Sequence, residues 1–139
     1  MKHATLAIAF LLALFCFIAP VRAASAYTGN LEGAIAHLLE TRSCVGCDLH
    51  NADLSNKDLR GVNLTRANLR KANLSGANMM AVNLQNADLH DADFRGADFL
   101  AVNLINANLR DAKFRRINLD SSRLCNTTTP EGKVTNRDC

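Results

Sequence analysis

Two cysteines at positions 44 and 47 have the spacing that best suits covalent chemistry. Cys44 and Cys47 form a Cys-x-x-Cys motif, which can carry out disulfide exchange where it opens a helix and one thiol pKa is lowered. Zinc binding would need further ligands, and only His37 and His50 lie nearby in the sequence. The motif follows a helical pattern here, so we expect a structural role, as a tight disulfide or a cap contact. Redox catalysis and metal binding are the alternatives.

A second pair of cysteines brackets the end of the chain. Cys125 and Cys139 are separated by a turn-rich segment that contains Pro130 and Gly132. A bridge between these cysteines would close a loop of about fifteen residues and contribute about 3 kcal/mol in the loop-entropy description. We expect this bridge to form, and two free thiols are the alternative.

A column of basic side chains is the candidate site for an anionic partner. These residues recur every twenty positions: His50, Arg70, His90 and Arg110. If the fold stacks residues twenty apart, they point outward from one side of the molecule. The alternative is a solvated face whose charge is offset by neighbouring carboxylates, namely Asp48, Asp88, Asp91 and Asp111.

A five-residue repeat determines how these residues are positioned. From Cys47 onward, sixteen successive blocks carry a large apolar residue at their third place: Leu49, Leu54, Leu59, Leu64, Leu69, Leu74, Met79, Leu84, Leu89, Phe94, Phe99, Leu104, Leu109, Phe114, Leu119 and Leu124. An unbroken period of five fits neither an amphipathic helix nor an alternating strand. Repeats of this regularity predict a solenoid.

A longer period shows how many blocks make one turn. Val62, Val82 and Val102 recur every twenty residues, so four blocks form one square coil and the region forms about four coils. The third residue and the small first residue of each block should face the axis. Asp or Asn at the second place can hydrogen-bond the backbone at the bend, which argues against acid/base catalysis by these carboxylates.

The blocks Ala52-Asp53-Leu54-Ser55-Asn56 and Ala67-Asn68-Leu69-Arg70-Lys71 resemble the pentapeptide-repeat family. This resemblance covers residues 47–126 and implies an all-β solenoid, the right-handed quadrilateral β-helix. Exported family members with a leading helix, a Cys-x-x-Cys motif and a Cys-closed tail are similar to lumenal or periplasmic proteins of photosynthetic bacteria. The resemblance therefore implies a binding or scaffolding module.

The domain boundaries follow from changes in composition. Lys2 and His3 precede an apolar run, and small residues surround position 23, so residues 1–23 are predicted to be a cleaved signal peptide. Residues 24–46 should form a linker and a capping helix, residues 47–126 the β-helix and residues 127–139 a disulfide-closed cap. We expect export to the periplasm or thylakoid lumen, or secretion, with no stable membrane insertion after cleavage.

Charge limits the classes of partner. Loss of Lys2 and Arg22 lowers Lys+Arg from 16 to 14 against 13 acidic residues, so the mature net charge is near +1. We expect no nucleic-acid partner. Some pentapeptide-repeat proteins resemble DNA and inhibit topoisomerases, and this role is one alternative function. Thiol-disulfide chemistry at Cys44 and Cys47 is another.

An apolar patch is the candidate surface for a protein partner. Met80 and Leu100 fall in one outward column, and Ile105 falls on the adjoining side. Exposed apolar patches mark contact sites more often than scattered apolar residues do. The sequence predicts a non-enzymatic binding protein, with no cofactor and an unidentified protein partner, that is a monomer because both ends of the solenoid are capped.

Overall fold

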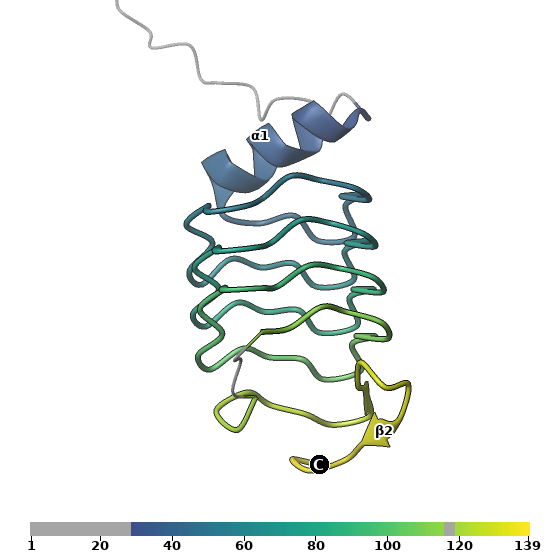
Figure 1. Ribbon diagram of the computed structural model, residues 1–139. Coiled ribbons are helices and arrows are strands. Elements are labelled where there is room, and N and C mark those ends of the chain that lie inside the picture. Colours follow the sequence, from purple (N-terminus) through teal and green to yellow (C-terminus); the bar gives the residue numbers. More distant parts are fainter. Residues whose placement is uncertain (1–28, 116–118) are drawn as a thin grey trace, which may run out of the picture.

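The computed structural model describes residues 29–115 and 119–139. The signal peptide predicted for residues 1–23 and the first residues of the linker lie outside this part of the chain. Its helix and strands are α1 (Leu31–Thr41), β1 (Thr127–Thr128) and β2 (Val134–Thr135). Figure 1 shows α1 lying across one end of a stack of coils, with β2 and the carboxyl terminus at the opposite end.

Helix α1 is fixed to the stack by its caps and by one apolar face. The Asn30 side chain accepts a hydrogen bond from the Gly33 N–H at 2.7 Å, which satisfies one of the free donors of the first turn. Ala34 and Leu38 are fully buried against the first coil. The helix ends where Arg42 adopts a left-handed conformation and its N–H bonds to the Leu38 carbonyl.

Parallel bridges between residues twenty apart form the ladder that joins the coils. The first bridge pairs Ser43 with Asn63, and the last pairs Asn108 with Thr128. The ladder therefore extends one block beyond the predicted 47–126 region at each end. Cys44 takes the inward third place in the additional first block. Because Cys44 is not a large apolar residue, the sequence pattern reveals the repeat only from the next block onward.

The interior is filled by the third-place side chains. Nearly all of those predicted to face the axis are buried, while Phe114 and Leu119 near the carboxyl end are partly buried. Phe94 stacks on Phe114 with ring centroids 5.1 Å apart, and Phe99 meets Phe94 edge to face at 5.2 Å. Full burial of such a side chain contributes about 1.5–3 kcal/mol, so this core is the main source of stability.

Most corners of the described coils are turns with a left-handed residue at the fifth place. In the first full turn Asn51 has φ 60°, and the Ala52 N–H bonds to the Leu49 carbonyl at 3.0 Å, the pattern of a type II turn. Second-place side chains complete the corner, as where the Ser55 N–H donates to Asp53 Oδ1 at 3.1 Å. The same bond forms with Asn at this place, so the predicted backbone role of Asp and Asn is confirmed.

The carboxyl end is closed by a short antiparallel hairpin of β1 and β2. Asp138 Oδ2 accepts the Leu124 N–H at 2.8 Å, and the Arg137 guanidinium donates to the carbonyls of Leu119, Asp120 and Ser122. These bonds satisfy backbone N–H and carbonyl groups that the last coil would otherwise expose.

Candidate functional site

The Cys44–Cys47 pair forms a disulfide at the first corner of the ladder, with Cα atoms 5.3 Å apart. Cys44 is buried, and Cys47 is half-buried. Helix α1 ends before the motif, so no helix begins there that could lower a thiol pKa. A depression of about 450 Å³ adjoins the bond and is lined by His37, Ser43, Val45, Gly46 and Cys47. Of the two cysteines, only Cys47 therefore has appreciable surface exposed to an external thiol.

The second cysteine pair, Cys125 and Cys139, is also bonded, with Cα atoms 4.9 Å apart. This bond ties the end of the chain to the last coil. It lies beside the β1–β2 hairpin and stabilises the cap.

The four residues of the basic column lie on successive coils. The Asn51 N–H bonds to the Arg70 carbonyl, the Lys71 N–H to the His90 carbonyl and the Asp91 N–H to the Arg110 carbonyl, at 2.9–3.0 Å. These bonds bring His50, Arg70, His90 and Arg110 into one column, as the twenty-residue spacing predicts.

Carboxylates offset much of the charge of this column. Arg70 pairs with Asp88 at 3.2 Å, and Arg110 lies 3.6 Å from Asp111. His90 is flanked by Asp91 and Asp111. The column is therefore a mixed-charge face, which fits the solvated alternative better than a site for an anionic partner.

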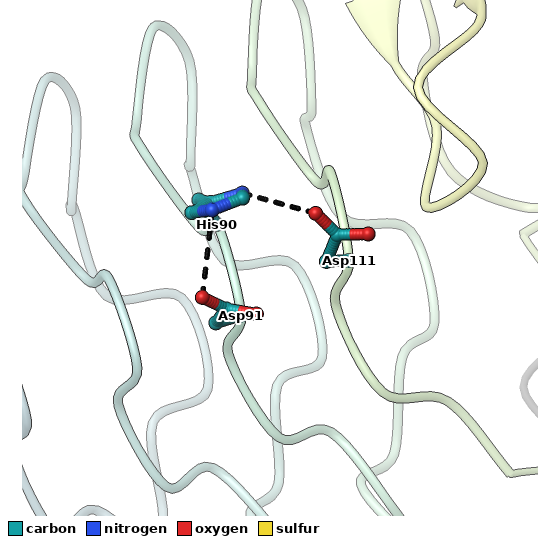
Figure 2. A group of neighbouring side chains, drawn as sticks. All are labelled: His90, Asp91 and Asp111. Atoms are coloured by element: carbon teal, nitrogen blue, oxygen red, sulfur yellow. Dashed lines mark ion pairs between the residues drawn. The ribbon is translucent and has the colours of Figure 1, made fainter.

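His90 and its two neighbours form the most concentrated group of potential metal ligands among the described residues. His90 Nε2 lies 3.4 Å from Asp91 Oδ2, and Nδ1 lies 3.8 Å from Asp111 Oδ2. Figure 2 shows the imidazole with one carboxylate near each of its nitrogens. The sequence placed all three residues on one face, but it did not indicate that they converge.

Carboxylates and amides alternate from coil to coil in three of the four second-place columns, whereas the fourth carries Asn63, Asn83 and Asn103. Asp48, Asn68, Asp88 and Asn108 occupy one of the alternating columns. The Asn68 amide donates to Asp48 Oδ1 at 2.9 Å and the Asn108 amide to Asp88 Oδ1 at 3.1 Å. An amide thus separates the carboxylates along the column, which reduces their repulsion.

Ion pairs on the other faces are local and structural. The Arg95 guanidinium hydrogen-bonds the Asp93 carboxylate and lowers the pKa of Asp93. Arg60 acts in the same way on the pKa of Asp58. A depression of about 440 Å³ lies near the first pair, lined by Lys71, Ala72, Asn73, Asp91, Asp93 and Lys113. Two lysines and two aspartates line this depression, so its charge favours neither a cationic nor an anionic ligand.

The predicted apolar patch is only partly exposed. Leu100 has 48% of its surface exposed, whereas Met80 and Ile105 are half-buried. The Ala81 N–H bonds to the Leu100 carbonyl at 2.9 Å, which puts Met80 and Leu100 on adjacent coils of one column. Val45 and Val134 are also exposed, but they lie near opposite ends of the ladder and were not part of the predicted surface.

In the described part of the chain, no helix combines the length and apolar character that crossing a membrane requires. No curated protein sequence matches the chain. Solved structures of several pentapeptide repeat proteins do match the chain.

Three of these structures come from two cyanobacteria and a plant. One from Cyanothece 51142 is 25% identical, with 76% of this chain and 99% of that chain covered and a TM-score of 0.40. One from Nostoc PCC 7120 is 33% identical, with 76% and 88% covered and a TM-score of 0.32. One from the Arabidopsis thaliana thylakoid lumen is 31% identical, with 67% and 70% covered and a TM-score of 0.28.

The family model described as a pentapeptide repeat region matches residues 47–124. Proteins with this repeat fold as right-handed quadrilateral β-helices and are in general structural or binding modules. The five-residue repeat accounts both for the bridges between residues twenty apart and for the apolar residue at the third place of each block. The chain therefore belongs to the pentapeptide repeat family.

Proposed function

We propose that this protein is an exported, non-catalytic binding or scaffolding module whose partner is another protein. Leu100 is the observation that carries the proposal. It is a large apolar side chain, about half exposed, at an outward place on a backbone that the ladder holds rigid. Exposed apolar patches mark protein contacts, so a partner that covers Leu100 and its apolar neighbours is the best-supported role. Met80 on the adjacent coil and Ile105 on the adjoining side complete the proposed surface.

Two alternative functions have less support. A DNA-shaped regulator of topoisomerases needs a continuous acidic face, whereas carboxylates here alternate with amides or pair with arginines. A thiol-disulfide protein needs an accessible and activated sulfur, whereas Cys44 is buried and its motif follows a helix. Both observations favour binding over regulation by DNA mimicry or redox chemistry.

Export is supported by the chemistry of the cysteines and by the amino-terminal pattern. Residues 1–23 have the composition of a signal peptide, and disulfides persist in oxidising compartments. A protein 31% identical to this one comes from the Arabidopsis thylakoid lumen. We propose the periplasm or the thylakoid lumen as the site of action. The protein would act there as a monomer, because α1 and the hairpin cover the two ends of the ladder.

The test is an affinity pull-down from the native exported compartment with three baits. These are the unaltered protein, a Met80→Glu, Leu100→Glu variant and a Ser55→Glu, Ser75→Glu control. The control adds the same charge at the same fourth place on two adjacent coils, in another column. Circular dichroism should first establish that all three baits are folded.

We expect a partner that the unaltered protein and the control retain and the patch variant loses. Retention by all three baits, or no partner for the unaltered protein, would overturn the proposed surface.

A further inference from the structure

Asp91 and Asp111 depart from the alternation of carboxylates and amides. The Asp91 N–H bonds to the Arg110 carbonyl at 3.0 Å, so the two aspartates occupy the same place on adjacent coils, where backbones lie about 4.7–4.9 Å apart. No amide lies between them in their column, in contrast to Asp48 and Asp88. Like charges on directly opposed residues are destabilising. Arg110 beside Asp111 and Lys71 near Asp91 offset part of this cost, and a cation bound between the two carboxylates would remove more of it.

His90 supplies a third donor beside the two carboxylates. One ligand atom from each of His90, Asp91 and Asp111 can be chosen so that all three lie within 4.8 Å of one another. The His90 side chain is only 21% exposed, while that of Asp111 is 58% exposed. The imidazole is therefore largely enclosed, whereas the Asp111 carboxylate is exposed; Figure 2 shows the two carboxylates on either side of the ring.

We propose that His90, Asp91 and Asp111 form a surface binding site for a divalent transition-metal ion of the zinc type. Zinc bonds to imidazole nitrogen and carboxylate oxygen are about 2.0–2.2 Å long, so its ligand atoms lie about 3.4 Å apart in a tetrahedron. A single ion bonds to one imidazole nitrogen, so closing the site requires the exposed Asp111 side chain to rotate toward the nitrogen that Asp91 already faces. Water completes the coordination on the open side. An imidazole donor favours zinc, copper or nickel over calcium or magnesium.

The position of Arg110 makes the proposal more specific. Its guanidinium lies 3.6 Å from Asp111 Oδ2 and competes with the metal for that carboxylate. Removal of this charge should therefore strengthen metal binding. A purely structural His90–carboxylate contact predicts no such effect.

His50 provides the matched control. It lies in the same column as His90, and the corresponding fifth-place residues around it are Asn51 and Lys71 instead of aspartates. A general affinity of surface histidines for zinc would involve His50 as much as His90.

The experiment is a titration of the purified, tag-free protein with zinc chloride, followed by calorimetry and by NMR of the histidine rings. We expect one zinc ion per chain and a shift of the His90 signals. Asp91→Asn and Asp111→Asn should each weaken binding at least tenfold, because loss of a group that merely hydrogen-bonds a metal ligand already costs about 10–100-fold. His50→Gln should bind as the unaltered protein does, and Arg110→Gln should bind more tightly.

Two results would overturn the site. The first is the absence of any zinc-dependent shift at His90. The second is equal zinc affinity in the unaltered protein and in both asparagine variants, which also keep the left-handed backbone that Asn tolerates.

Discussion

Asp and Asn at the second place of the block have two hydrogen-bonding roles, one within the corner and one between coils. Nearly all of them accept the N–H of the residue two positions later, as Asn73 does from Ser75 at 3.1 Å. Along the columns, Asn amides also donate to the carboxylate of the preceding coil, as Asn73 does to Asp53 at 3.3 Å. The corner hydrogen bond could be predicted from the sequence because it is local. The hydrogen bond between coils could not be predicted, because its partners are four blocks apart. A comparison of consecutive blocks shows Asp and Asn replacing each other without a pattern.

Asn73 lies between Asp53 and Asp93 and tests this alternation. Asn73→Asp should destabilise the protein, since it places three carboxylates on consecutive coils, and added salt should reduce the loss. Asn73→Ala should cost about 1–3 kcal/mol at any ionic strength, because it leaves backbone and side-chain groups without a partner. Urea unfolding at low and high salt measures both effects. An Asn73→Asp variant as stable as the unaltered protein at low salt would contradict the role given to the alternation.

At the scale of elements, the two ends of the ladder differ in how well they could be predicted. Asn30 followed by an apolar face is a local signal for a helix start, and α1 begins where that signal lies. The hairpin of β1 and β2 has two-residue strands, which are too short for any periodicity to show. The sequence therefore indicated only a turn-rich tail.

The Cys125–Cys139 disulfide should stabilise this carboxyl-terminal element in particular. Replacement of both cysteines by serine should lower the free energy of unfolding by up to about 3 kcal/mol, because the unfolded chain regains the entropy of the open loop. Hydrogen exchange should accelerate most at hairpin amides such as Thr129 N–H, which bonds to the Lys133 carbonyl. Amides of the central coils, such as Leu84 N–H, serve as the internal control. Equal acceleration at both would show that the bond does not act locally.

For the whole molecule, the fold could be predicted from the sequence, whereas the exposure of the proposed partner surface could be predicted only in part. A period of five within a period of twenty determines which residues face the axis, and the buried Leu64, Leu84 and Leu104 follow from it. Exposure on the outer faces depends on how each side chain packs against its neighbours. Leu100 is exposed while Met80 of the same column is half-buried. Likewise, a regular column of basic residues did not indicate the convergence of two carboxylates on His90.

Ionised carboxylates stabilise the whole solenoid, so its stability should fall in acid. The pKa values of Asp58, Asp93 and Asp138 are lowered by hydrogen bonds from Arg60, Arg95 and Arg137. A lowered folded pKa contributes stability that is complete above the unfolded value of about 3.9 and is lost as the pH falls through the folded value.

Thermal unfolding followed by circular dichroism should therefore give a constant Tm from pH 7 to about pH 5 and a decline below about pH 4. Asp93→Asn should show a shallower decline. A Tm that starts to fall near pH 6 would indicate that other groups control the acid response.

The register of the ladder also limits how genes for such proteins can change in length. Because bridges join residues twenty apart, duplication of twenty residues adds a coil and leaves every later side chain on its original face. Duplication of a single five-residue block would preserve the core equally well but would move every later column onto the neighbouring side. If the extra block lay between Arg70 and His90, then His90 and Arg110 would no longer share a face with Arg70. Length variants that keep a working surface should therefore differ by whole coils.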